Sequence, residues 1–214
     1  MKKISVAIDS PAAAGAGTQA KLIAKHYNLF YLDTGKIYRF IGFLKIRYKN
    51  KFDYSLIRKK IKTLKIKDLN KKLLLSDKVA TEASVVAKNQ KIRKIVFNFQ
   101  KKCAYKPPQK FSGSILDGRD ITSVIMKNAM FKFYITANIK TRALRRFKEL
   151  KLLNKKISYQ DVLKSIKKRD KNDFNRKHSP LKKTKDSILI NTTNLTKRSC
   201  FLKIKQIMDK KLFN

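Results

Sequence analysis

The feature that most constrains this chain lies at its start, where a short apolar run passes through small residues into a helical pattern. Ile4–Ile8 is β-prone and ends at Asp9-Ser10-Pro11, and residues 17–26 keep helical spacing. Small side chains between them let backbone N–H groups approach an anion at the positive end of the helix dipole. The passage predicts a strand, a phosphate-binding loop and a helix. The loop residues that would contact the phosphates are Ala13, Ala14, Gly15, Ala16, Gly17 and Thr18.

The loop departs from the Walker pattern G-x-x-x-x-G-K-[ST] at two places. Ser10 stands at the first Gly and Ala16 at the Lys, with Gly17 before Thr18. Glycine placement favours a site, because the chain has only six Gly and Gly15, Gly17, Gly35 and Gly118 all fall at loops that would border it. The loop by itself leaves two interpretations open: a nucleotide-phosphate site, or a small-residue turn without a ligand.

Apolar runs along the chain predict a parallel α/β fold. Four further strands are expected at 29–32, 114–116, 131–136 and 187–190, and helical spacing recurs at 37–48 and 201–208. We expect one domain with a five-stranded parallel sheet flanked by helices, whose core comprises 1–36, 110–140 and 178–214. Two segments look like insertions: about 37–109, with two short strands around 70–72, and about 141–177, a helical pair broken near Asn154 and restarted at Ser158 with Asp161 in its first turn.

Net charge indicates a polyanion or a general bias toward lysine. The chain has 54 Lys plus Arg against 14 Asp plus Glu, a formal charge of +40. The cations are spread along the whole sequence, which favours lysine at solvated positions over a dedicated nucleic-acid surface, and no RNP, zinc-finger or helix-turn-helix pattern occurs. The sequence has neither a signal-peptide core nor eighteen consecutive apolar residues, so a cytoplasmic protein without a membrane span is expected. Cys103 and Cys200 lack metal-ligand spacing, so we expect no direct metal ligand set.

Arginine is informative in a chain that otherwise uses lysine. Only 11 of the 54 cations are Arg, and a guanidinium makes a planar two-pronged contact with phosphate that an ammonium cannot copy. On helices, Arg142, Arg145 and Arg146 would share one face, and Arg169, Asp173 and Arg176 another. One such pair would suggest ordinary surface ion pairing. Several groups together favour an anionic ligand. The arginines in these short segments are Arg39, Arg93, Arg119, Arg145, Arg146, Arg169 and Arg176.

Three further segments resemble the bacterial cytidylate kinase family. They are Tyr31–Arg39 (YLDTGKIYR), Leu116–Ile121 (LDGRDI) and Arg169–Arg176 (RDKNDFNR). With the loop they match in order and spacing over nearly the whole chain. The resemblance implies a P-loop kinase fold, with segment 37–109 binding the monophosphate and segment 141–177 acting as a lid. It also implies transfer of a phosphoryl group from ATP, with Mg²⁺, to CMP or dCMP. Apart from the resemblance, we expect a monomer.

The resemblance also assigns roles to residues. Arg39, Arg119 and Arg176 would hold the acceptor phosphate, and Thr34 belongs to the same substrate-binding set. Ser84, Arg93 and Asp120 would read the cytosine edge, and Arg169 with Asp173 would face the acceptor sugar. Arg145 and Arg146 would reach over the transferring group, so that Arg119, Arg145, Arg146 and Arg176 form the catalytic set. Thr18 would lie near Mg²⁺ through water.

Ala16 is the serious departure from this family, and Asn172, at a position that is often basic, is a lesser one. Losing a fixed phosphate-binding charge can cost on the order of a hundredfold in rate. Lys21, a lid arginine or another lysine would have to supply that charge. The alternatives are a nucleotide-binding homologue with weak or no catalysis, a related kinase with another base preference, and a basic nucleic-acid-binding protein.

Overall fold

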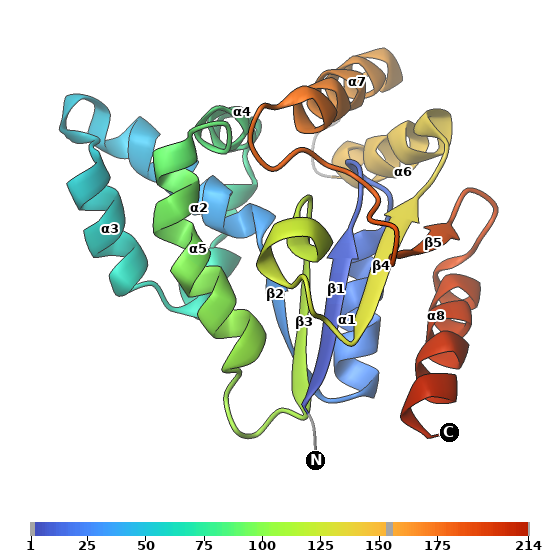
Figure 1. Ribbon diagram of the computed structural model, residues 1–214. Coiled ribbons are helices and arrows are strands. Elements are labelled where there is room, and N and C mark those ends of the chain that lie inside the picture. Colours follow the sequence, from blue (N-terminus) through green and yellow to red (C-terminus); the bar gives the residue numbers. More distant parts are fainter. Residues whose placement is uncertain (1–2, 153–155, 214) are drawn as a thin grey trace.

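The computed structural model describes residues 3–152 and 156–213, which form five strands and a set of helices (Figure 1). The elements are β1 (Ile4–Asp9), α1 (Ala16–His26), β2 (Leu29–Asp33), α2 (Gly35–Tyr48), η1 (Lys49–Lys51), α3 (Tyr54–Lys62), η2 (Ile66–Asn70), η3 (Lys72–Leu75), α4 (Asp77–Val86), α5 (Gln90–Tyr105), β3 (Gly113–Gly118), η4 (Ile121–Ile125), β4 (Phe131–Thr136), α6 (Ile139–Lys151), α7 (Tyr159–Asn175), β5 (Ile188–Asn191) and α8 (Lys197–Leu212).

The strands form one sheet in the order β2-β3-β1-β4-β5, and every pair is parallel. The five predicted strands are all present, each within two residues of its expected limits. Because parallel strands end at one edge, the segments that follow β1, β2 and β3 meet there. The register pairs Asp33 of β2 with Asp117 of β3, and Asp9 of β1 with Gly118.

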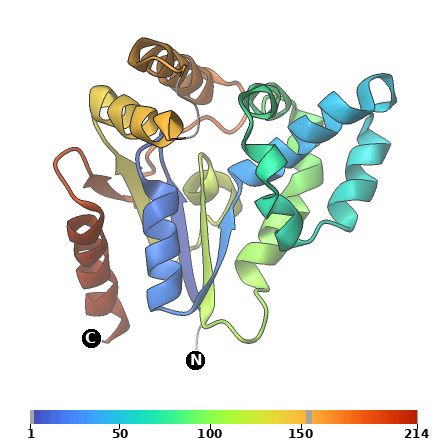
Figure 2. The same ribbon diagram turned by 180° about the vertical axis from the view of Figure 1, so that it is seen from behind.

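Helices cover both faces of the sheet (Figures 1 and 2). Alternate residues of β1 point to opposite sides: Ala7 joins the buried cluster formed with α2, α5 and η4, whereas Val6 and Ile8 join the cluster formed with α1 and α8. This alternation explains why Val6, Ala7 and Ile8 are apolar in succession. Helices α6 and α7 lie above the carboxyl ends of the strands in Figure 1. Their own small cluster includes Ala143, Val162 and Ile166 and also takes in Ala12 of the loop after β1.

Helix α7 begins as the sequence predicts. The Ser158 hydroxyl accepts a hydrogen bond from the Asp161 N–H at 3.1 Å, which caps the first turn. The expected break near Asn154 falls outside the described residues.

The two short strands expected around 70–72 are wrong. Single-turn helices, η2 and η3, occupy this stretch and bury Leu69 and Leu74. The Lys65 N–H is capped by the Asp68 carboxylate at 3.2 Å, a local bond that competes with an extended backbone. An isolated strand pair would also have needed a hydrophobic face to pack against a larger sheet.

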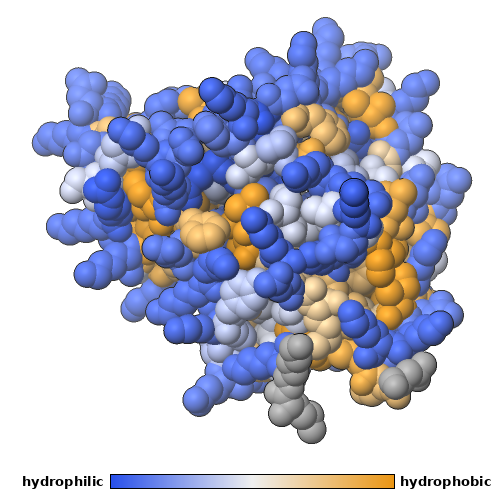
Figure 3. Space-filling model, viewed as in Figure 1, coloured by the Kyte–Doolittle hydropathy of each residue, from blue (hydrophilic) through white to orange (hydrophobic). Residues whose placement is uncertain are grey.

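Hydrophilic side chains spread across the whole face seen in Figure 3, with apolar patches between them. They do not gather over one element on this face. The distribution agrees with lysine at solvated positions throughout the chain. No helix among the described residues is long and apolar enough to cross a membrane.

Candidate active site

A cavity of about 970 Å³ opens at the carboxyl edge of the sheet. Its wall includes the loop after β1, the starts of α1 and α2, the end of β3, and parts of α4 to α8. Every site residue predicted from the sequence lines it: Ala13, Ala14, Gly15, Ala16, Gly17, Thr18, Thr34, Arg39, Ser84, Arg93, Arg119, Asp120, Arg145, Arg146, Arg169, Asp173 and Arg176. Residues separated by more than 150 positions therefore share one chamber.

The loop after β1 has the backbone geometry of an anion site. Gly15 adopts a left-handed conformation (φ 91°) immediately before α1 begins at Ala16, and Ala13 also has a positive φ of 59°. No side chain caps the start of α1, so its first N–H groups remain available to a ligand at the positive end of the helix.

Contacts from distant segments hold this loop in place. Arg142 of α6 donates to the Ala12 carbonyl at 2.9 Å, and Asp170 of α7 accepts from the Ala12 N–H at 3.1 Å. Arg142 and Asp170 also pair with each other at 2.6 Å, and both are buried. On the other flank the Thr192 hydroxyl donates to the Ala14 carbonyl at 3.1 Å. Helices α6 and α7 therefore hold this loop in place. The position of Arg142 on its helical face did not by itself predict this structural role.

Two acidic residues organise the arginines on the far side of the cavity. Arg119 donates from Nε to Asp173 at 2.8 Å, and Arg93 forms a short ion pair with Asp120. Arg176 lies 3.8 Å from both carboxylates and is only 6% exposed at its side chain. Its Nη2 atom has no hydrogen-bond partner among the described residues and is buried. We call Arg93, Arg119, Asp120, Asp173 and Arg176 the arginine–aspartate network.

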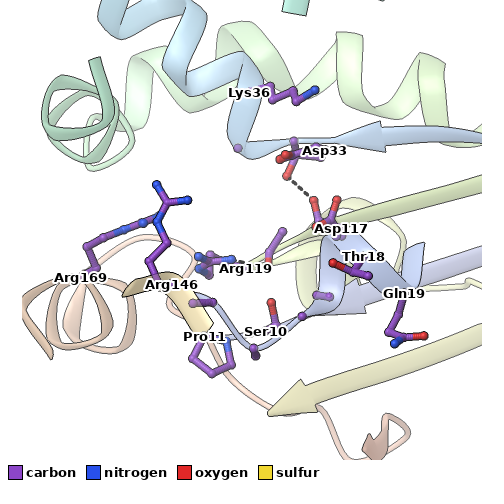
Figure 4. A pocket seen from close by; sticks show the side chains of 18 of the residues that line it. Ser10, Pro11, Thr18, Gln19, Asp33, Lys36, Asp117, Arg119, Arg146 and Arg169 are labelled. Carbon is purple, nitrogen blue, oxygen red and sulfur yellow. Dashed lines mark hydrogen bonds between the residues drawn. The ribbon is translucent and has the colours of Figure 1, made fainter. Parts of the chain in front are cut away.

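Arg169 adds an unbalanced charge beside this network. Burial lowers the pKa of its guanidinium to about 10, and the neighbouring Arg119 acts in the same direction. Among the described residues it makes no ion pair. Figure 4 shows Arg169 on the same side of the cavity as Arg119 and Arg146. Such an excess of buried positive charge is favourable only when an anion is bound.

The remaining predicted arginines are engaged with the protein. Arg145 donates to the Thr192 hydroxyl at 2.9 Å and to the Thr192 carbonyl at 2.6 Å, and Arg146 pairs with Glu149 at 3.2 Å. Arg39 donates to the Leu74 carbonyl at 3.0 Å. Ser84 lines the cavity while its hydroxyl donates to the Ala80 carbonyl at 3.3 Å.

A pair of carboxylates, which sequence reasoning did not select, lies on the loop side of the cavity. Asp33 is the last residue of β2 and pairs in register with Asp117, the next-to-last residue of β3, and Figure 4 shows both near Thr18. Burial, and then the Asp33 charge, raise the pKa of Asp117 to about 8, and its Oδ1 atom is buried with no hydrogen-bond partner among the described residues. The sequence offered one signal for this pair: each Asp directly follows a predicted strand, in the motifs YLD and LDG.

The ends of these strands approach each other too closely for a side chain at Gly118. A Cβ there would lie 2.4 Å from Thr34 Oγ1. The Thr34 hydroxyl donates to the Asp117 carbonyl at 2.8 Å, and Thr34 lines the cavity. Gly118 is therefore required by packing next to the site.

The parallel sheet order, the small-residue loop before α1 and the cation-lined cavity together define a P-loop nucleotide kinase. The family model for cytidylate kinase matches residues 6–210. The chain belongs to the cytidylate kinase family.

Curated relatives agree with this assignment, and a solved structure shares the fold. The chain is 38% identical over 208 residues to the cytidylate kinase of Bartonella tribocorum, covering 94% of this chain and 92% of that protein. It is 36% identical to the cytidylate kinase of Mesomycoplasma hyopneumoniae, covering 99% and 96%. A crystal structure of an uncharacterized protein from Eubacterium ventriosum aligns with a TM-score of 0.57 at 17% identity, covering 97% of this chain and 99% of that one. This last likeness shows the fold alone.

Proposed function

We propose that this protein transfers the terminal phosphoryl group of ATP to CMP or dCMP, giving CDP or dCDP. The observation that carries the proposal is the shared cavity, in which the phosphate-binding loop and the arginine–aspartate network face a common space. Phosphoryl transfer requires little more from protein than positioning of the two nucleotides and positive charge around the transferring group.

The acceptor nucleotide would lie against the network. Arg39, Arg119 and Arg176 hold its phosphate, and the orphaned Nη2 of Arg176 supports this role because a phosphate oxygen would satisfy it. Arg169 and Asp173 face the sugar. Asp173 already orients Arg119, so the same carboxylate would serve both the ribose hydroxyls and the phosphate site.

The base would be read by Ser84, Arg93 and Asp120. Asp120 accepts from the exocyclic amine of cytosine while Arg93 donates toward the ring acceptors, and the ion pair between them fixes both orientations. Uracil presents an oxygen where cytosine presents the amine, so it would face a carboxylate without a donor. A site built on such hydrogen bonds rejects the wrong base strongly.

The donor side would use the loop backbone from Ala13 to Thr18, with Mg²⁺ held through water by Thr18, Asp33 and Asp117. Hydroxyl and carboxylate oxygens fit this ion, which keeps several of its waters, and the unpartnered Asp117 Oδ1 fits a water-bridged contact. When bound, Mg²⁺ would neutralise part of the negative charge of the donor phosphates.

Segment 141–177, with helices α6 and α7, would act as the lid, and segment 37–109 as the monophosphate-binding insertion. Arg145 and Arg146 would cover the transferring group from the lid. To do so they must exchange their present contacts with Thr192 and Glu149 for the nucleotide phosphates. Closure would exclude water, which otherwise accepts the phosphoryl group.

A second candidate, a nucleotide-binding homologue with weak catalysis, is favoured by one observation, Ala16 at the Walker lysine position. The paired acceptor arginines argue against it, because they would serve no purpose in a protein that binds only ATP. A monomeric state and a cytoplasmic location stay predictions from the sequence.

A coupled ATP-consumption assay with CMP, dCMP, UMP and AMP tests the function. We expect turnover with CMP and dCMP, less with UMP, and the least with AMP. Tight ATP binding without nucleotide-dependent turnover would favour the second candidate. Preference for AMP would contradict the roles given to Asp120 and Arg93.

A further inference from the structure

The donor phosphates need a fixed positive charge that residue 16 does not supply. Ala16 is 4% exposed and packs in the cluster that includes Ala20 and Ile23. The loop from residue 10 to residue 18 contains no charged side chain. Any side-chain charge that acts with Mg²⁺ on the donor phosphates must therefore come from another part of the cavity wall.

Most cations that line the cavity already have partners. Arg93 and Arg119 pair with aspartates, Arg145 and Arg146 contact Thr192 and Glu149, and Lys36 donates to Asn70 at 2.6 Å. Among the described residues, four lining cations have neither a hydrogen bond nor an ion pair from their charged ends. These are Lys21, Lys148, Arg169 and Lys197.

Location separates these four. Arg169 belongs to α7 and lies near Arg119, on the side of the cavity proposed for the acceptor nucleotide. Lys148 is on α6, and Lys197 is the first residue of α8. Only Lys21 belongs to α1, the helix whose first turn forms the phosphate loop.

Helix geometry directs Lys21 toward the donor phosphates. Side chains on a helix lean toward its N-terminus, so Lys21 overlies the turn that carries Gly17 and Thr18, and all three residues line the cavity. Residues 17 and 21 are separated by roughly 6 Å along the helix axis. The flexible four-carbon stem of a lysine can cover this distance.

We propose that Lys21 is a catalytic residue that supplies the donor phosphates with the positive charge ordinarily provided by the Walker lysine. The inference rests on the proposed function, since it names the residue that makes transfer efficient despite Ala16. In the free protein Lys21 lines the same cavity as Asp33 and Asp117. With ATP bound at the loop, Asp33 and Asp117 would hold Mg²⁺ through water, and the Lys21 ammonium would contact the donor phosphate oxygens.

The test compares K21A with the control K25A, which removes an exposed lysine one turn further along the same helix and outside the cavity. We expect K21A to lower kcat about a hundredfold, the usual cost of losing one fixed stabiliser of the transition state. K25A should stay within about twofold of the unmodified protein, as expected for an exposed lysine. K21R should recover at least a tenth of the activity, because the charge is retained.

A double-mutant cycle adds the reciprocal test. If Lys21 replaces the Walker lysine, K21A should cost roughly tenfold less in an A16K background than in the unmodified chain. Thermal unfolding of each variant identifies any loss of fold, and K21R provides the charge-retaining comparison should A16K fold poorly. Equal losses in both backgrounds would overturn the proposal.

ATP affinity, measured by calorimetry on the same variants, separates this inference from the proposed function. K21A should weaken ATP binding about tenfold or more, a loss in the range for a charge-assisted hydrogen bond, whereas K25A should not. This result decides the role of Lys21 even if the unmodified protein fails to phosphorylate CMP. Turnover and ATP affinity in K21A equal to those of K25A would overturn the inference while leaving the proposed function intact.

Discussion

The two halves of the cavity use charge in opposite ways. The arginine–aspartate network carries its charge on side chains that are paired and oriented within the protein, as in Arg119 with Asp173. The loop of residues 10–18 carries none, and it presents backbone N–H groups held in place by Arg142, Asp170 and Thr192. The loop depends on the shape of its backbone, and the side-chain charge that serves it comes from Lys21, outside the loop. A site that reads a base and a monophosphate depends on particular side chains.

The largest effect should follow from removing Arg176 from the network. R176M removes the guanidinium whose Nη2 has no hydrogen-bond partner among the described residues, and we expect kcat/KM for CMP to fall about 10²–10³-fold. Because the loop is untouched, the KM for ATP should change little. The control is K177M, at an exposed neighbour. An equal loss of ATP binding in R176M would show that the two halves are not separate.

Asp120 provides the next test, which concerns base selectivity. D120N replaces an acceptor with a group that can also donate, so it should favour uracil relative to cytosine. We expect the ratio of kcat/KM for CMP to that for UMP to fall on the order of tenfold to a hundredfold. The experiment uses both substrates on both proteins. An unchanged ratio, with reduced rates for both bases, would mean that Asp120 only positions Arg93.

Asp117, on the loop side of the cavity, should make the stability of the protein depend on pH. Because burial raises its pKa from 3.8 to about 8, the folded protein retains a proton that the unfolded chain releases. The contribution of Asp117 to the free energy of unfolding of the nucleotide-free protein should therefore be complete below pH 4. It should decline as the pH rises toward 8. D117N should lack this part of the slope in denaturant titrations.

The ionisation of Asp117 should also affect the reaction rate through Mg²⁺ binding. At limiting Mg²⁺ the rate should rise with pH up to about 8, because the metal requires the ionised carboxylate. Saturating Mg²⁺ should flatten the profile, and chelation should abolish turnover. A rate at limiting Mg²⁺ that falls between pH 6 and 8 would exclude Asp117 from the metal site.

The smallest effect is expected from restoring the Walker lysine. In the unmodified background A16K should change kcat by less than about tenfold, because Lys21 already provides most of the charge that one such group contributes. A hundredfold gain would show that no other residue compensates for Ala16. The lack of side-chain charge in the loop would then mean a loss of catalytic function.

Much of this arrangement could be predicted from the sequence, since it depends on local patterns. The β-prone run before Asp9 and the small residues after it define strand, loop and helix, and the motifs around Arg119 and Arg176 indicated the cavity that they line. Asp33 and Asp117 were missed because their proximity arises from the pairing of β2 with β3, a long-range register. The anchoring role of Arg142 depends on its contact with Ala12, 130 positions away. The prediction of two short strands around 70–72 was wrong for a different reason. There the local hydrogen bond from the Lys65 N–H to the Asp68 carboxylate outweighed a weak strand propensity.

The most direct test of this division of labour compares the affinities of the unmodified protein for CMP and for cytidine. If the guanidinium groups of the network converge on the acceptor phosphate, CMP should bind roughly a hundredfold or more tightly than cytidine, and added salt should reduce the difference. Equal affinities would contradict the central claim, because the arginines would then contribute nothing to holding the acceptor.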